Sequence, residues 1–445
     1  MRNRIRCTSL ASALALGLVL PACDILDVNN PNNLTKDDIH AIEAANALVN
    51  GAEAANENAF ANMWLITLTA ADEIVWIGSR DAWGQLDQGY LTNPANEFTD
   101  AAFPLLTQAR YLADLAVTVL DTHVDTATVV TTRLKEDQAR AYLHAGLIYT
   151  IVGEVQEDFV FGAEQEAEAP IGPSNMKNIL DQAIQKLDQA VTLATALNNA
   201  ELLNRALAFR ARAKHSRAIW DKIKPTVSSQ PLVSSAGATA DAATVIGRVA
   251  ANWRYQFTYS AASRSNDISG WTNSRGEHQF DTTSVVSVSK AAPKTILAVK
   301  LHDPVGGEPD VRILNFLKEF KADANIGVAG TVYSPLTVIS AKHMRLILAE
   351  DELAKGNIVG FITHINAVRA VDGLPPYAGV PAPLDMLKYE RRAALFLTGV
   401  RLLDMYRFGI KDPLWQPASD AFTKPGTLLP ITCIERNANP NIPDC

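Results

Sequence analysis

Apolar side chains recur at spacings of three and four residues along most of the chain, which is typical of amphipathic helices. The clearest stripe runs from Ile179 to Ala194, where an apolar residue returns at every helical turn. The same periodicity predicts helices over residues 39–49, 103–120, 134–152, 202–220, 341–354 and 361–368. Gly146 and Ala183 are small residues of the kind that lets paired helices approach closely in tetratricopeptide repeats. The pattern therefore predicts a mainly α-helical fold, with tetratricopeptide-like helix pairs over 35–224 and a further helical repeat within 334–445.

A second long stripe lies near the end of the chain, between Tyr389 and Gly409. Its apolar members return every three or four residues, which predicts one long helix with charged residues mostly on the opposite face; they are Ala393, Phe396, Leu397, Val400, Leu403 and Met405. Arg401 and Asp404 are spaced to pair along the exposed surface of this helix, at a gain of a few tenths of a kcal/mol. Gly409 is expected to end the helix.

Two stretches interrupt the helical pattern. Residues 71–92 contain two tryptophans, one tyrosine and three glycines, which predicts an aromatic loop. Residues 225–333 are rich in Ser, Thr, Ala and Gly and show no long helical period, so we expect an irregular region there. Within it, short alternating pieces at 284–289 and 295–300 predict a small β-hairpin.

Both irregular stretches carry candidate ligand-binding residues. A sugar presents an apolar face of C–H groups and a rim of hydroxyls, so its site needs aromatic platforms edged by amide, carboxylate and guanidinium groups. The side chains that offer this mixture are Trp76, Arg80, Asp81, Trp83 and Tyr90 in the first stretch, and Trp253, Tyr255 and Trp271 with Arg254, Asn266 and Asp267 in the second. Each aromatic ring could instead belong to the core, and the sequence leaves that alternative open.

Signatures of common enzymes are missing from the sequence. It has no H-E-x-x-H, C-x-x-C, G-x-S-x-G or G-x-x-x-x-G-K-[ST] motif, and its eight histidines show no metal-ligand spacing. We therefore expect no catalytic residue, no metal ion and no cofactor. The adjacent acids at 72–73 and 351–352 leave a glycoside hydrolase as an alternative, although neighbouring side chains on a helix point apart.

Composition indicates a globular, acidic protein. Apolar residues make up 48% of the chain and charged residues 20%, with a net charge of −8. An acidic chain has little attraction for nucleic acid or an anionic membrane surface, so we expect neither as a partner. The basic residues at 205, 210, 212, 214 and 217 are accordingly expected to form a solvated helix face.

The first residues indicate export and lipid attachment. Three arginines precede an apolar run from Leu10 to Leu20, and Leu20-Pro21-Ala22-Cys23 resembles a lipobox. This predicts a signal peptide at 1–22, an acylated Cys23 and a tether at 23–34, with an ordinary secretory signal as the alternative. In an oxidising compartment, Cys433 and Cys445 could close a disulfide around the C-terminal tail; the alternative is two free thiols.

Several motifs resemble those of one protein family. Glu390-Arg391, Leu395, Gly399, Arg401, Asp404, Arg407 and Phe408-Gly409 resemble the E-R-x-x-E-L-x-x-E-G-x-R-x-x-D-L-R-R-(W/F)-G signature of SusD/RagB-like outer-membrane lipoproteins. Ala394 and Thr398 replace two glutamates of that signature. Further similar segments lie at 24–31, 344–350, 366–369 and 430–440.

This resemblance implies both a fold and a function. The fold would be a right-handed superhelical scaffold of tetratricopeptide-like helix pairs, with 225–333 facing the ligand and 334–445 closing the structure. The protein would be lipid-anchored and surface-exposed at the outer membrane, contacting the membrane through its lipid alone. It would capture oligosaccharide, or another polymeric nutrient, for a TonB-dependent SusC-like transporter without making or breaking bonds. A peptide ligand, as in the RagB branch, and a secreted helical scaffold that binds only protein are the alternatives.

Overall fold

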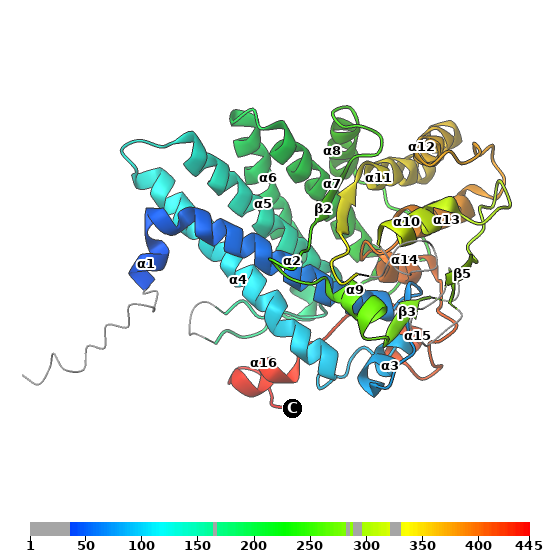
Figure 1. Ribbon diagram of the computed structural model, residues 1–445, viewed down its shortest axis with the longest axis horizontal. Helices are drawn as coiled ribbons and strands as arrows, with labels where there is room; N and C mark the ends of the chain where they lie inside the picture. The colour runs from blue at the N-terminus through cyan, green and yellow to red at the C-terminus, as the bar shows by residue number, and fades with distance from the viewer. Residues whose placement is uncertain (1–35, 163–166, 282–284, 288–295, 321–330) are drawn as a thin grey trace, which may run out of the picture. The chain divides into compact units, whose positions relative to one another are not determined.

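Five long helices form the scaffold of the structure, a computed structural model that describes residues 36–162, 167–281, 285–287, 296–320 and 331–445. They are α2 (Ala45–Thr69), α4 (Glu97–Thr126), α5 (Thr132–Val155), α6 (Lys177–Ala196) and α7 (Ala200–Ile223). Asn96, Thr131 and Asn199 cap the starts of α4, α5 and α7 by accepting backbone N–H groups. In order along the chain, each of the five helices packs against the next (Figure 1). The predicted mainly helical fold of tetratricopeptide-like pairs is confirmed.

Close contact between α5 and α6 depends on two glycines of α5. A Cβ atom added at Gly146 would lie 2.3 Å from Cγ of Leu187, and one added at Gly153 would lie 2.6 Å from Cγ of Leu180. Both leucines are buried on α6. The missing side chains therefore set the distance between the two helices, as predicted for Gly146.

We expect Gly146→Ala to destabilise the protein by about 1–3 kcal/mol, because the added methyl group overpacks the α5–α6 interface. Gly51 in α2 provides a matched control, since a Cβ atom there meets nothing within 4 Å. Gly51→Ala should stabilise the protein by about 0.5–1 kcal/mol through helix propensity alone. Chemical denaturation of both variants measures the difference. Equal free energies of unfolding would show that α5 and α6 do not require the glycines.

Two further helical elements, α3 (Asp81–Asp87) and η2 (Pro173–Asn175), lie between scaffold helices in the chain, and others follow α7. The elements that follow α7 are α8 (Ala236–Ile246), α9 (Asp267–Ser269), η3 (Gly270–Ser274), α10 (Val311–Glu319), α11 (Ala341–Ala354), α12 (Ile358–Val371), α13 (Pro383–Ala394), α14 (Arg401–Phe408), α15 (Asp420–Thr423) and α16 (Cys433–Ala438). Helices α11 and α12 pack together as the predicted C-terminal pair. Helices α3, α8 and α10 were not predicted. α3 lies in the stretch at 71–92 that was predicted to be a loop, α8 buries only two alanines, one aspartate and one valine, and α10 is only nine residues long.

Strands occur as antiparallel pairs. β1 (Ile74–Trp76) pairs with β3 (His278–Phe280), and β2 (Arg254–Phe257) pairs with β6 (Leu336–Ser340). β4 (Val285–Ser287) pairs with β5 (Ile296–Val299), which confirms the predicted hairpin in its described residues. Strand pairing therefore joins the region at 225–333 to β1, which follows α2, and to β6, which precedes α11.

The segment from Tyr389 to Gly409 is not one helix, so that prediction is wrong. α13 ends at Ala394 and α14 begins at Arg401, and the turn between them has positive φ at Leu397 (56°) and at Gly399 (76°). A Cβ atom at Gly399 would lie 2.4 Å from Nε1 of Trp64 on α2. Glycine is therefore required both by the left-handed backbone and by the close approach to the indole.

Charged residues of this segment are buried, contrary to the prediction of an exposed charged face. Arg401 does not pair with Asp404; its Nε and Nη2 donate to Asp72 at 2.5 and 2.7 Å. Asp404 instead accepts from Nε of Arg391 at 2.7 Å and from Nε of Arg407 at 2.9 Å. At most 5% of the surface of each of these five residues is exposed, so the pairs belong to the core.

The basic residues of α7 also have partners, which corrects the prediction of a solvated face. Arg212 is buried and donates to both carboxylate oxygens of Glu154, at 3.0 and 2.7 Å. Arg210 and Lys214 both donate to Asp241 of α8. These side chains therefore join α7 to its neighbours.

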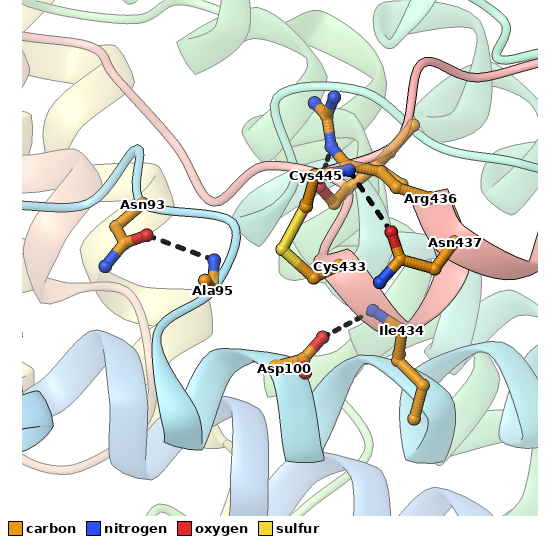
Figure 2. The surroundings of a disulfide bond; sticks show 9 residues. Asn93, Ala95, Asp100, Cys433, Ile434, Arg436, Asn437 and Cys445 are labelled. Atoms are coloured by element: carbon orange, nitrogen blue, oxygen red, sulfur yellow. Dashed lines mark hydrogen bonds between the residues drawn. A yellow bond between two sulfur atoms is a disulfide. The ribbon is translucent and has the colours of Figure 1, made fainter.

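The C-terminal tail docks beside the start of α4. Cys433 and Cys445 form a disulfide, and the backbone N–H of Cys445 donates to Oδ1 of Asn437 at 3.2 Å (Figure 2). The backbone N–H of Ile434 donates to Oδ1 of Asp100 on α4 at 2.7 Å. The tail is thus fixed by hydrogen bonds as well as by the covalent bond.

Residues 45–445 form one compact unit. The segments predicted at 35–224, 225–333 and 334–445 all contribute residues to it. The short helix α1 (Lys36–His40) and the helical turn η1 (Ile42–Ala44) belong to a separate small unit. Within the described ranges, no helix combines the length and the apolar character needed to cross a bilayer. The predicted signal peptide, Cys23 and the tether lie outside the described residues.

Candidate functional site

Pairing of β1 with β3 brings the two predicted ligand-binding stretches together. Trp76 lies opposite His278 in this ladder, and the N–H of Ile77 donates to the carbonyl of Glu277 at 2.9 Å. The Glu277 carboxylate accepts from the N–H groups of Ser79 and Arg80, at 2.9 and 3.3 Å. Burial opposes ionisation of Glu277, but these two N–H groups lower its pKa overall. The start of α3, with Arg80, is thereby held beside residues 267–277.

A pocket of about 260 Å³ lies at this junction. Its lining comes from α2, the starts of α3 and α4, and the α9–η3 turn, and includes Asn62, Arg80, Trp83, Glu97, Phe98, Asp267, Trp271 and Arg275. Four of the candidate ligand-binding residues, Arg80, Trp83, Asp267 and Trp271, therefore line one pocket.

Three aromatic rings pack at the centre of the pocket wall. Trp83 and Phe98 are stacked, with ring centroids 3.9 Å apart and planes 12° apart. Trp271 meets both rings edge to face, at 5.3 and 5.2 Å. Trp83 is only 2% exposed and Trp271 8% exposed, whereas Phe98 is half-buried. Phe98 is therefore the most exposed residue of this aromatic cluster, and Trp83 packs against one face of its ring.

Polar groups surround the rings. Arg80 forms an ion pair with Glu97 and places its guanidinium carbon 5.9 Å from the centre of the Phe98 ring. The guanidinium carbon of Arg275 lies 4.3 Å from the centre of the Trp271 ring. On the α2 side, Nδ2 of Asn62 donates to Asp267 at 2.8 Å. Burial raises the pKa of Asp267, although the Asn62 amide partly offsets this effect.

The other predicted ligand-binding residues lie elsewhere. Tyr255 is 6% exposed and packs edge to face against Phe257, with the guanidinium carbon of Arg205 4.3 Å from its ring centre, so it is part of the core. Trp253 lines a different pocket. Trp76, Asp81 and Tyr90 line neither pocket; Trp76 packs against Gly84, where a Cβ atom would lie 2.9 Å from the indole.

Phe98 was missed because the predicted helix began at residue 103, whereas α4 begins at Glu97. Asn96 caps this helix and acids follow at Glu97 and Asp100, which is a recognisable signal for a helix start. Extending the helix back to that signal would have placed Phe98 in its first turn, next to the aromatic stretch.

The adjacent acids that left a hydrolase open have structural partners. Asp72 is 4% exposed and bound by Arg401, and Glu73 is 1% exposed and accepts the N–H of Leu397. Asp351 accepts from the hydroxyl of Ser234 and from Nζ of Lys355, both at 2.6 Å. Among the residues that the structure describes, no cluster of three His, Cys, Asp or Glu side chains is placed to hold a metal ion.

Asp87, at the end of α3, makes stability depend on pH. Burial raises the pKa of Asp87 to about 8, and the charges of Asp412 and Asp281 add to this effect. An aspartate in the unfolded chain has a pKa of about 4, so the folded state binds this proton more tightly and loses stability as the pH rises from about 4 to 8. We expect Asp87→Asn to raise the melting temperature at pH 8 and to change it little at pH 5. An equal change at both pH values would contradict this assignment.

Comparison with known proteins shows similarity of structure. A scan against protein-family models finds no match, and a search of curated proteins finds none. Among solved structures, a SusD superfamily protein from Bacteroides vulgatus is 13% identical with a TM-score of 0.64, and the match covers 90% of this chain and 97% of that chain. A SusD homolog from Bacteroides thetaiotaomicron is 13% identical with a TM-score of 0.64, covering 91% and 97%. A laminarin-binding SusD-like protein is 17% identical with a TM-score of 0.52, covering 88% and 97%.

These matches extend over nearly the full length of each chain. They confirm at the level of fold the resemblance seen in the sequence motifs. The chain therefore has the fold of the SusD superfamily.

Proposed function

We propose that this protein is a non-catalytic binding protein that captures oligosaccharide in the pocket around Phe98. The observation that carries the proposal is the composition of the pocket wall, in which a half-buried phenyl ring is surrounded by guanidinium, carboxylate and amide groups. A phenyl ring can cover the C–H face of a sugar, and the polar groups can bind its hydroxyls. The SusD-like fold supports the same conclusion, since one of the similar proteins binds laminarin.

Three of the four charged side chains in this pocket already have polar partners, and the fourth, Arg275, lies over the Trp271 ring, which favours a neutral ligand over a charged one. Arg80 is paired with Glu97, and Asp267 is hydrogen-bonded to Asn62. A charged peptide would have to compete with these existing partners, whereas sugar hydroxyls can add to them as both donors and acceptors. We therefore propose saccharide rather than peptide as the ligand class.

Titration calorimetry of the mature protein tests this proposal. The probes are laminari-, malto-, xylo- and manno-oligosaccharides, with a mixed peptide library as the competing ligand class. Saturable binding of at least one oligosaccharide, accompanied by a change in tryptophan fluorescence, is the expected result. Binding of peptides with no response to any of these saccharides would overturn the proposal.

We further propose that the protein is anchored by an acylated Cys23 at the outer membrane and delivers its ligand to a TonB-dependent SusC-like transporter. The lipobox-like sequence before Cys23 supports the anchor, and the SusD-like fold supports the transporter as partner. Metabolic labelling with palmitate should mark the wild-type protein but not Cys23→Ala, which should leave the membrane fraction. Co-purification of a β-barrel transporter with the wild-type protein from its native membrane tests the partnership.

A further inference from the structure

A second pocket, of about 360 Å³, lies between α10, strands β2 and β6, and the turn that follows α13. None of its lining residues lines the pocket around Phe98. We propose that this second pocket, which we call the Trp253 cleft, is a separate binding site for a neutral saccharide. This inference rests on the proposed function, because it assigns a second site for the same ligand class.

Small side chains keep the cleft open at its α13 end. Ala393, Ala394 and Thr398 line it, and Ala394 and Thr398 stand where the signature described above has glutamates. Two glutamate side chains in place of a methyl group and a short hydroxyl would occupy part of this space. The volume that remains lies within the range of small-molecule pockets, about 300–1,000 Å³.

Charged groups in the wall of the cleft already have partners. Nη1 and Nη2 of Arg254 donate to the two carboxylate oxygens of Glu319, at 2.6 and 2.5 Å. Nζ of Lys342 donates to Asp372 at 2.6 Å.

The third cation of the wall is paired behind the cleft. Nε and Nη2 of Arg312 donate to Asp310 at 3.0 and 2.7 Å, and its Nη1 donates to Glu390 at 2.5 Å. Each of the three cations is therefore neutralised within the protein. A charged ligand would gain little here and would disturb these pairs, so the cleft suits a neutral molecule.

The remaining lining has the mixture that a sugar requires. Trp253 and Phe316 are half-buried, so each exposes part of a ring, and Phe396 meets Phe316 edge to face at 5.2 Å. Side-chain amides of Asn252 and Asn315 and hydroxyls of Thr337 and Ser340 lie in the same wall. Rings can cover C–H groups, and amides and hydroxyls can both donate to and accept from sugar hydroxyls.

Trp253 is held in place before any ligand arrives. Its backbone N–H donates to the carbonyl of Ala250 at 2.9 Å, and its carbonyl accepts from the N–H of Ala341, also at 2.9 Å. The residue after it begins β2, which is paired with β6. Because the backbone at Trp253 is already fixed, little backbone entropy is lost on binding, which favours affinity.

The experiment is titration calorimetry of the mature protein with the oligosaccharide that binds best among laminari-, malto-, xylo- and manno-oligosaccharides. Ala394→Glu restores the signature residue and fills the cleft, and Asn315→Ala removes an exposed amide without filling it. Phe98→Ala weakens the first pocket alone. We expect two binding sites in the wild type, with Ala394→Glu removing one site, Asn315→Ala weakening that site about 3- to 10-fold, and Phe98→Ala weakening the other.

The outcomes separate this inference from the proposed function. If Phe98→Ala abolishes all binding while Ala394→Glu and Asn315→Ala titrate like the wild type, the Trp253 cleft is not a site and the proposed function stands. If Ala394→Glu abolishes all binding and Phe98→Ala has no effect, the cleft is a site and the assignment of the first pocket is wrong. A wild-type protein that binds none of these oligosaccharides overturns both.

Discussion

Replacing Glu350 with alanine is expected to lower the free energy of unfolding by about 3–5 kcal/mol, enough to unfold a marginally stable protein. Glu350 is fully buried on α11 and accepts from the guanidinium of Arg407, from Nε2 of His215 at 3.1 Å and from the N–H of Val233 at 2.9 Å. Nη1 of Arg391 lies 3.7 Å away. Removing this carboxylate leaves two buried guanidinium groups with Asp404 as their remaining acidic partner.

The effect should also depend on pH. Burial opposes ionisation of Glu350, but the charge of Arg407 holds the pKa of this carboxyl well below its usual value. A pKa lowered in the folded state stabilises the protein above the unfolded value of about 4.5 and loses that stabilisation as the pH falls through the folded value. The difference in free energy of unfolding between the wild type and Glu350→Ala should therefore be largest at pH 7. It should shrink only in strongly acidic solution.

Glu201 provides a control of the same chemistry. It also forms an ion pair, with Arg205, but its side chain is 71% exposed. Glu201→Ala should cost no more than about 1 kcal/mol, because exposed pairs contribute little. Urea denaturation of both variants at pH 7 measures the comparison. If Glu350→Ala were no more destabilising than Glu201→Ala, the buried network would not be important for stability.

The sequence pattern near the C-terminus was misleading for two reasons, one for the turn and one for the buried charges. Apolar residues keep helical spacing through Phe396, Leu397 and Val400, so the turn between α13 and α14 leaves no trace in periodicity. What fixes the turn is Trp64 of α2, more than 300 residues earlier, which leaves room only for Gly399. Burial of the charges depends likewise on distant partners such as Asp72, which a local pattern cannot reveal.

The type of residue was enough to select side chains that the structure places in one pocket. Trp83, Trp271 and Arg80 were singled out for their chemistry, and the structure brings them to one pocket. Sequence alone could not separate rings that face the pocket from rings that pack behind them. The position of each ring depends on the β1–β3 pairing, which joins residues about 200 positions apart. It also placed Tyr255 with the ligand-binding residues, although Phe209 and Phe257 enclose it in the core.

Phe98→Ala is expected to weaken oligosaccharide binding at least tenfold, which corresponds to about 1.4 kcal/mol or more. The substitution removes the most exposed ring of the aromatic cluster and leaves the stacked face of Trp83 uncovered toward the pocket. It also removes the surface over which Arg80 lies. Affinity for the best oligosaccharide, measured by calorimetry at several temperatures below the melting transition, tests the prediction.

Loss of a half-buried ring also costs stability, so the change in binding needs a control that loses a similar ring elsewhere. Phe161 is half-buried and lies beneath a guanidinium group as Phe98 does, with the guanidinium carbon of Arg110 5.5 Å from its ring centre. It lines neither pocket. Phe161→Ala should therefore lower the melting temperature by a comparable amount and leave affinity unchanged. Equal losses of affinity in both variants would mean that binding follows overall stability, whereas unchanged affinity in Phe98→Ala would exclude this ring as a ligand platform.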